Sequence, residues 1–508
     1  MFGWGKFFPL LFLVQFLSRT GIGFQPSPFQ YLAGIGYKTG YSWKNPSGIE
    51  SGNRGTMMMM ASMGVTQDEN NNKRAKTSVS DQTPKPHLNS TAAVTFHVVG
   101  DAYVDFFSFL DGEWPESGGD SRLGEPVKCY AGGSSVNTAT HLKALITNFT
   151  AAPKPEVVLH TVLNPDDQYG QMLMDHTSKH GIPVDNRKRE GDTSTTGHCI
   201  AIVSGGERSF MTHQGVVENF TADDLDVEEF ASTPTHLHLH IAGFYNIPGF
   251  WNGTLKRKLE AVRKKRKERF PNKNTTISLV TQHDATKEWD GGLRDLFPLL
   301  DFVLMNDLEA RSIISSGRRR TLQQTSEDHR GAFGDDFEHE HLEWADYFGS
   351  LHSTSKAIVT RGEKGSVALR GKKILSKQKP IVMNSIDPTG AGDSFTAGFI
   401  FGLWSWKLGG LESAASDLLT NNNPTESSKH NPRDGDDSID NDTWPIEAIE
   451  EGMRWGVSLA SAAVMIRGAS VPPERSEIQK FLRQAKQPEY PPSSTKAVAV
   501  PTSAGVAS

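Results

Sequence analysis

The sequence predicts an α/β fold with a mostly parallel central sheet and helices on both faces of that sheet. Short apolar runs bounded by turn residues recur between residues 94 and 485, and segments with helical periodicity separate several of them. Two other segments alternate β-branched and aromatic residues around glycines, which is typical of a small separate sheet. We therefore predict one domain over residues 94–485.

The first strand is predicted at Phe96–Gly100, where an apolar run ends at a glycine. Seven later apolar runs are also predicted to be strands: Val157–Val162, His198–Val203, His236–Ala242, Thr276–Thr281, Phe302–Met305, Ala357–Thr360 and Ser366–Leu369. Five segments have helical periodicity: Ser135–Ile146, Tyr169–Lys179, Leu255–Phe270, Asp307–Ile314 and Ile446–Met465. This alternation indicates βαβ units and parallel strands.

The predicted helix Leu255–Phe270 is strongly basic. Its apolar residues Leu255, Leu259, Val262 and Phe270 are spaced for one helical face. We interpret it as a solvated surface helix, and an anion-binding patch is the alternative.

Further β segments are predicted within residues 103–130 and 196–212. Residues 315–341 are highly charged, and residues 420–442 consist largely of Asn, Asp, Ser and Pro. Neither segment has an apolar periodicity, so both are predicted to be surface inserts. Residues 486–508 are predicted to be a disordered tail.

The first 90 residues are predicted to be a targeting sequence that is not part of the fold. Residues 1–23 contain Lys6 followed by an apolar run, Phe7–Leu17, which has the length of a signal-peptide core and is too short to span a bilayer. Residues 24–90 open at Phe24 with an acid-poor stretch that is transit-peptide-like. The two parts resemble the bipartite presequences of algae with secondary plastids, which implies a plastid location. The alternatives are a cleaved secretory signal, or an incorrectly assigned start followed by disorder in a cytoplasmic protein.

The charge balance and the cysteine count exclude several classes of protein. The net charge of −6 gives no general attraction to nucleic acid or to anionic membranes, so we expect neither as a partner of the mature form. Two cysteines, Cys129 and Cys199, cannot build a disulfide framework and lack metal-ligand spacing. These observations favour an enzyme of a reducing compartment.

The segment Asp387–Asp393 reads Asp-Pro-Thr-Gly-Ala-Gly-Asp, and Phe395, Phe399 and Leu403 after it are spaced for one helical face. Pro388 bars helix before the glycines, so the motif should open a helix. The first backbone N–H groups of a helix lack intrahelical partners and attract anions. The motif therefore predicts an anion site.

Within this motif, Gly390, Ala391 and Gly392 are predicted to form an anion hole for a phosphate. Asp393 in the first turn is predicted to act as a general base toward an attacking hydroxyl. An acid at a helix start is often only a cap, but the second carboxylate at Asp387 and the Gly-Ala-Gly turn favour phosphoryl transfer. The chain has no Walker lysine pattern.

The Asp387–Asp393 segment closely resembles the C-terminal signature of the ribokinase-like (PfkB) carbohydrate kinases. Four further motifs resemble the family's motifs in the expected order: Gly100–Asp105, Gly132–Asn137, Asn306–Glu309 and Thr360–Gly365, and the late helix with its loop is matched at Ala460–Ala469. The resemblance covers residues 94–485. It implies a ribokinase-like fold with a small β lid, within residues 103–130 and 196–212, and an ATP-dependent kinase that phosphorylates a hydroxyl of a small sugar.

The resemblance also implies roles for individual residues. Substrate binding falls to Asp105, Gly132, Gly133 and Asn137. ATP binding falls to Thr360, Gly362, Gly365 and Gly468. Asn306 and Glu309 are implied in placing Mg²⁺ through water, and Asp387, with Ser470, in holding a monovalent cation such as K⁺.

Alternatives to a sugar kinase remain open. A nucleoside kinase, acting on an adenosine-like acceptor, has the same fold. Plastid proteins of this family that have lost the base act as non-catalytic scaffolds, but Asp393 and the Gly-Ala-Gly turn are retained here. Lids of this family often pair edge to edge, so a homodimer through the lid is a further expectation.

Overall fold

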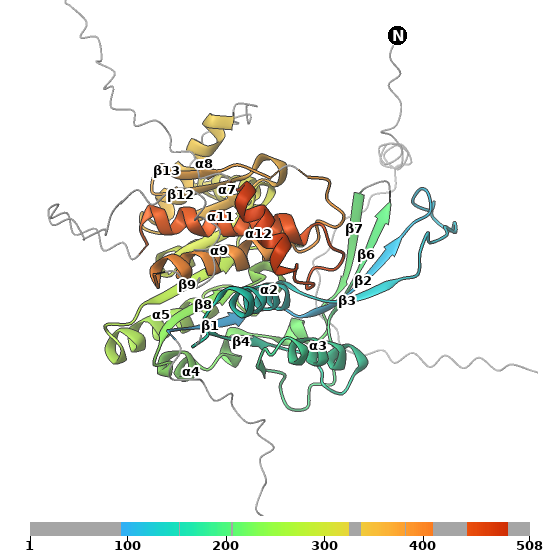
Figure 1. Ribbon diagram of the computed structural model, residues 1–508, viewed down its shortest axis with the longest axis horizontal. Coiled ribbons are helices and arrows are strands. Elements are labelled where there is room, and N and C mark those ends of the chain that lie inside the picture. Colours follow the sequence, from blue (N-terminus) through green and yellow to red (C-terminus); the bar gives the residue numbers. More distant parts are fainter. Residues whose placement is uncertain are drawn as a thin grey trace, which may run out of the picture. The chain divides into compact units, whose positions relative to one another are not determined.

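The computed structural model describes residues 93–151, 153–204, 207–324, 337–381, 383–409 and 444–485. These residues form a central sheet between two helical layers, and a second, smaller sheet projects from one side (Figure 1). Among the helices of these ranges, none combines the length and the apolar character needed to cross a bilayer. The predicted targeting sequence and tail lie outside the described residues.

The central sheet has nine strands in the order β13-β12-β11-β10-β9-β8-β1-β4-β5. The seven strands from β11 to β5 are mutually parallel, whereas β12 and β13 run antiparallel at one edge. Their bounds are β1 Val94–Val99, β4 Glu156–Thr161, β5 Val184–Asn186, β8 His236–Ile241, β9 Thr275–Val280, β10 Phe302–Asn306, β11 Lys356–Thr360, β12 Ser366–Arg370 and β13 Lys373–Gln378. The prediction of a mostly parallel sheet is confirmed.

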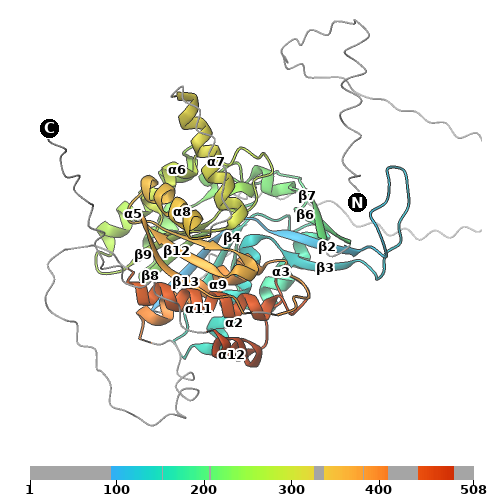
Figure 2. The same cartoon turned by 90° about the horizontal axis from the view of Figure 1, so that it is seen from above.

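The helices lie on both faces of this sheet (Figure 2). One face packs with α2 Ser134–Phe149, α3 Gln168–Lys179, α9 Ala391–Lys407, α11 Ile446–Ala463 and α12 Arg475–Gln484. The other face packs with α4 Val227–Ser232, α5 Thr254–Arg269, α6 Leu293–Leu296, α7 Asp307–Gln324 and α8 Phe337–Leu351. Buried apolar side chains from alternating positions of the strands fill both interfaces.

The second sheet has four strands in the order β3-β2-β6-β7. These are β2 Tyr103–Phe109, β3 Lys128–Gly132, β6 His198–Ser204 and β7 Glu207–His213. They come from the two segments predicted to form the lid, and the sheet lies beside the carboxyl end of β1, because β2 follows β1 after a three-residue turn.

The segment predicted to be a charged insert at 315–341 is partly helical. The helix α7 continues to Gln324, ten residues beyond the predicted end at Ile314, and α8 begins at Phe337. Ser316 and His341 are buried, so their part of the segment belongs to the packed domain. The predicted insert at 420–442 lies outside the described residues.

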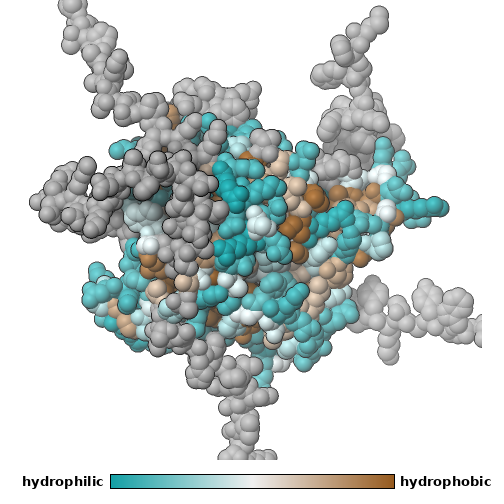
Figure 3. All heavy atoms as spheres, viewed as in Figure 1, coloured by the Kyte–Doolittle hydropathy of each residue, from teal (hydrophilic) through white to brown (hydrophobic). Residues whose placement is uncertain are grey.

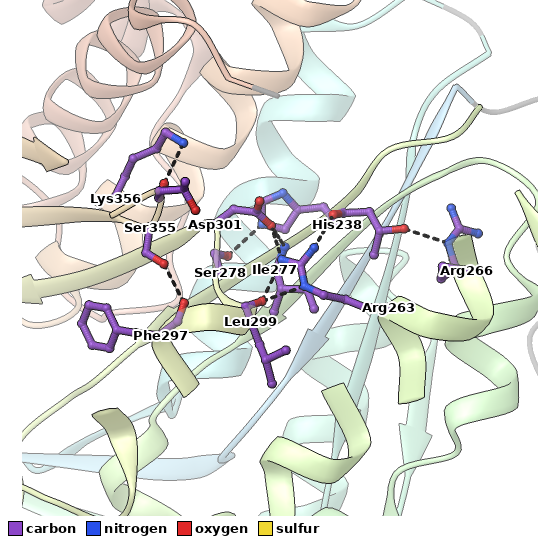
Figure 4. A network of polar contacts seen from close by, with 12 residues as sticks. His238, Arg263, Arg266, Ile277, Ser278, Phe297, Leu299, Asp301, Ser355 and Lys356 are labelled. Atoms are coloured by element: carbon purple, nitrogen blue, oxygen red, sulfur yellow. Dashed lines mark hydrogen bonds and ion pairs between the residues drawn. The ribbon is translucent and has the colours of Figure 1, made fainter. Parts of the chain in front are cut away.

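Two arginines of the basic helix α5 bind oxygens of neighbouring segments of the domain. Arg263 donates to the backbone oxygen of Leu299 at 2.9 Å and pairs with the carboxylate of Asp301 at 2.7 Å, which in turn accepts from the Ile277 N–H (Figure 4). Arg266 is buried and donates to the backbone oxygens of Thr233 and Thr235. Because these two cations bind the protein's own oxygens, the structure favours the predicted surface helix over an anion-binding patch, although Arg266 is buried and not solvated.

Helices α9 and α11 cross at very short range through small residues. A Cβ added at Gly398 of α9 would lie 2.6 Å from the backbone oxygen of Trp455, and one at Gly402 would lie 2.6 Å from that of Glu451. In α11, Gly456 likewise faces the ring of Phe395. This crossing fixes α9, whose first turn reaches the candidate site described below.

We expect Gly398→Ala to lower the free energy of unfolding by about 1–3 kcal/mol, because its methyl group would push α9 away from α11. Urea unfolding followed by circular dichroism measures this. Gly124→Ala is the matched control, since a Cβ there meets its nearest atom at 3.7 Å. Equal stability of the two variants would contradict the close crossing.

Candidate active site

The candidate site lies at the carboxyl ends of the parallel strands, where the first turn of α9 meets them. A pocket of about 170 Å³ is lined by residues from the ends of β9, β10 and β11 and by the start of α9. Strand β1 lies between β4 and β8 in the sheet. The chain first adds β4 and β5 along one edge direction from β1, and then adds β8 and β9 in the opposite direction. Ligands of open α/β sheets bind near such a change of direction.

The start of α9 has the geometry of an anion site. Gly390 takes φ +73° before the first helical residue, and a Cβ there would lie 2.6 Å from the Cβ of Ala469. In the described part of the chain, the N–H groups of Gly390, Gly392 and Asp393 have no hydrogen-bond partner. The N–H of Ala391 differs, because it donates to the Pro388 oxygen at 3.2 Å. The predicted anion hole is thus open at Gly390 and Gly392 and partly used at Ala391.

Asp393 is buried, and three side chains donate to its carboxylate. Ser134 Oγ donates to Oδ1 at 2.7 Å, Asn137 Nδ2 to Oδ2 at 2.8 Å, and Gln282 Nε2 to Oδ1 at 3.0 Å. Burial raises the pKa of Asp393 to about 6, and these hydrogen bonds oppose the rise. The carboxylate is held rigidly and titrates close to neutral pH, as a general base requires.

The donors to Asp393 come from distant parts of the chain. Ser134 and Asn137 lie in the first turn of α2, and Gln282 follows β9 and takes φ +61°. The other end of the Asn137 amide accepts from the hydroxyl of Ser470. Asn137 therefore orients the carboxylate, and its second amide hydrogen is left for the predicted contact to a substrate.

Two more aspartates lie near Asp393 but do not line the pocket. Asp101 follows β1, is buried, and accepts from Ser134 N at 3.1 Å and Asn246 Nδ2 at 2.8 Å. Asp105 lies within β2 of the second sheet, in the segment predicted to form the lid. Burial raises the pKa of each to about 7.

The negative charges of Asp101, Asp393 and Asp387 raise the pKa of Asp105 further. Asp105 is therefore close enough to these three carboxylates to be repelled by them. Gly132 is required beside Asp105, because a Cβ there would overlap its carboxylate, and Gly133 packs against the backbone of Asp101. None of Asp105, Gly132 and Gly133 lines the 170 Å³ pocket. Asp105 and Gly132 belong to strands β2 and β3 of the second sheet, and Gly133 directly follows β3.

Asn306 and Glu309 line the pocket and are bonded to each other. Glu309 is buried and accepts from Thr281 Oγ1 at 2.7 Å and from both nitrogens of Asn306, at 2.8 and 3.1 Å. Burial raises the pKa of Glu309 above its usual value. A carboxylate has about four acceptor positions, so one remains. This set fits a hydrated Mg²⁺ held through water, which is the predicted arrangement.

The residues predicted to bind ATP are not all at the pocket. Thr360 lines it. Gly362 and Gly365 lie in the turn between β11 and β12. The N–H of Gly468 donates to Asp387 Oδ2 at 3.1 Å, and a Cβ on Gly468 would lie 2.5 Å from the ring of Tyr130 in β3. Gly468 thus packs under the second sheet.

Asp387 was expected to hold a monovalent cation. In the structure, its Oδ1 accepts from Thr389 N at 3.0 Å and lies 3.4 Å from Nη1 of Arg208 in β7. With the bond from Gly468, three N–H donors face the carboxylate. The set does not fit a bound cation, because the guanidinium already supplies the positive charge.

Sequence reasoning missed Ser134, Gln282, Asp101 and Arg208. Ser134 and Asp101 lie inside motifs that were recognised, so their polar side chains were a usable signal. Gln282 and Arg208 have no local signal, since they reach the site only through the register of β9 and the placement of β7.

The sequence is similar to sequences of known carbohydrate kinases. Residues 96–415 match the model of the pfkB family carbohydrate kinases. The fructoselysine 6-kinase of Escherichia coli (strain K12) is 24% identical over 314 residues, which are 61% of this chain and 89% of that protein.

Solved structures share the fold. Ribokinase from Giardia lamblia superposes with a TM-score of 0.55 and 17% identity, over 77% of this chain and 99% of that chain. Phosphofructokinase-2 from Escherichia coli, solved in complex with potassium, gives a TM-score of 0.51 and 14% identity, over 77% of this chain and 99% of that chain.

We expect Asp105→Asn to become more stable than the parent as pH rises from about 4 to about 7. An Asp with a raised pKa binds more protons when folded than when unfolded in this range, so its contribution to stability falls as pH rises. Thermal midpoints across this range measure the difference. Asp120→Asn, on the exposed loop between β2 and β3, gives the baseline for removing one carboxylate. Parallel curves for parent and Asp105→Asn would contradict the assignment.

Proposed function

Because the chain belongs to the pfkB family of carbohydrate kinases, we propose that it transfers the γ-phosphate of ATP to a hydroxyl of a small sugar, with Asp393 as general base. Family membership makes it a phosphotransferase with an alcohol group as acceptor. The observation that carries the residue assignment is the buried carboxylate of Asp393, which three donors hold beside the unpaired N–H groups at the start of α9.

In this proposal the transferred phosphate lies at the amino end of α9. The N–H groups of Gly390, Gly392 and Asp393 donate to its oxygens, and the helix dipole adds a favourable field. Asp393 accepts the proton of the attacking hydroxyl, and Asn137 and Gln282 keep its carboxylate in place. Asp105 holds adjacent hydroxyls of the acceptor, which suits a carboxylate with two oxygens.

The nucleotide and the metal would bind in the 170 Å³ pocket. Thr360 contacts the nucleotide, and Asn306 and Glu309 hold Mg²⁺ through its water ligands. Magnesium supplies neutralisation of the phosphate charge. The second sheet acts as the lid that excludes water from the acceptor.

A small sugar is favoured by the relatives, one of which is a fructoselysine 6-kinase and another a ribokinase. The second sheet exposes Phe210 and Met211 on β7 and Val127 just before β3, and Figure 3 shows hydrophobic surface in this part of the molecule. We propose that a second copy covers this face in a dimer. We also propose a plastid location, on the composition of residues 1–90.

A panel assay of ADP release tests the function. We expect turnover with a sugar such as ribose, fructose or a fructosamine, and little with adenosine. Asp393→Ala should lower the rate by roughly 10²–10⁴-fold, because the base is lost. Asp120→Asn is the control for removing one carboxylate, because Asp120 lies on the exposed loop between β2 and β3. Asp387→Asn is unsuitable for this purpose, because Asp387 lies in the segment that leads into α9. Preference for adenosine would indicate a nucleoside kinase. Failure of MgATP to raise the thermal midpoint would indicate a scaffold.

The dependence of the rate on pH tests the positioning of the base. The rate should rise with pH through about 6, where Asp393 becomes ionised. Gln282→Leu removes a hydrogen bond that stabilises the ionised form, so the rise should move upward by about one pH unit. A lower rate with an unmoved profile would mean that Gln282 only supports the fold.

A further inference from the structure

Arg208 of the second sheet reaches across to the loop that opens α9. Its Nη1 donates to Thr389 Oγ1 at 2.8 Å and lies 3.4 Å from Asp387 Oδ1. Asp387 is buried and Arg208 is 22% exposed, so the pair is partly shielded from solvent. The guanidinium thus bonds the two ends of the Asp387-Pro388-Thr389 turn at once.

This turn leads directly into the proposed phosphate site. Thr389 is followed by Gly390, and the Pro388 oxygen accepts from Ala391 N. An ionised carboxylate at Asp387 would repel a phosphate at the start of α9 unless a positive charge lay beside it. Some cation is therefore needed at Asp387.

A free monovalent ion fits this position poorly. Asp387 Oδ1 already faces Arg208 and Thr389 N, and Oδ2 faces Gly468 N, so N–H hydrogens point at the oxygens that an ion would need. The hydroxyl of Ser470, the other expected ligand, is 1% exposed and donates to Asn137. An ion would also meet the like charge of the guanidinium.

We propose that Arg208 takes the place of a monovalent cation in this kinase. As a positioning residue, it neutralises Asp387 and holds the turn that presents the N–H groups of α9, so phosphate binding does not depend on K⁺. The inference rests on the proposed function, because it assumes that the phosphate binds at the start of α9.

The test compares the full chain with Arg208→Ala, Arg208→Lys and Arg122→Ala. Arg122 is exposed on the loop between β2 and β3, so Arg122→Ala removes the same charge from the same sheet. Affinity for MgATP is measured by calorimetry in KCl and in tetramethylammonium chloride at equal ionic strength. Thermal midpoints without nucleotide are measured in the same two salts.

We expect the dissociation constant of the parent and of Arg122→Ala to differ by less than about twofold between the salts. Arg208→Ala should bind MgATP more weakly in tetramethylammonium chloride, and K⁺ should restore binding by about fivefold or more, because it enters the vacated position. Arg208→Lys keeps the charge and should resemble the parent.

A parent protein that needs K⁺ for MgATP binding would overturn the proposal. So would an Arg208→Ala protein that matches Arg122→Ala in both salts. If no protein binds MgATP, the proposed function fails, and the thermal midpoints still decide the inference: K⁺ should raise the midpoint of Arg208→Ala but not of the parent. If Arg208→Ala does not fold, the parent and Arg208→Lys decide it by their response to K⁺.

Discussion

The burial of the Asp393 carboxylate at the amino end of α9 is the constraint on which the rest of the site depends. An ionised carboxylate removed from water must be compensated by hydrogen bonds. Ser134 and Asn137 supply two of them from α2, and Gln282 supplies the third from the end of β9. These donors meet only if α2 and α9 are packed on the same face and β9 keeps its register. The crossing of α9 with α11 through glycines fixes the helix that carries the carboxylate.

Much of this fold follows from local signals in the sequence. The parallel strands are short apolar runs, and the start of α9 is marked by Pro388 and two glycines, so the family, the fold class and this helix start were predictable. The extension of α7 to Gln324 was not, because that stretch is charged and buries small polar residues such as Ser316 rather than an apolar stripe. Asp105 was named from the Gly100–Asp105 motif, but its position beside Gly132 depends on the pairing of β2 with β3, which no local signal shows.

The site residues divide in the same way. Residues inside a motif could be named from the sequence, because their spacing is fixed by one turn of chain. Gln282 and Arg208 could not, since each is more than 100 residues away from its partner in the α9 segment, and no periodicity connects them. Anion-hole geometry has the same limit: only the coordinates show that Ala391 N–H already has an acceptor while Gly392 N–H has none.

Within the described residues, two ion pairs connect the second sheet and its β2–β3 loop to the loops around the phosphate side, and they are not equivalent. Glu125 pairs with Arg467, next to Gly468, but both side chains are substantially exposed, at 26% and 40%, so water and salt weaken this pair. Arg208 pairs with Asp387 in a setting where the acid is 7% exposed. The Arg208–Asp387 pair is therefore better shielded on its acidic side, whereas the Glu125–Arg467 pair is shorter, at 2.6 Å against 3.4 Å. In the proposed arrangement the positive charge beside Asp387 comes from Arg208 of β7, so the phosphate site includes a residue of the second sheet as well as the start of α9.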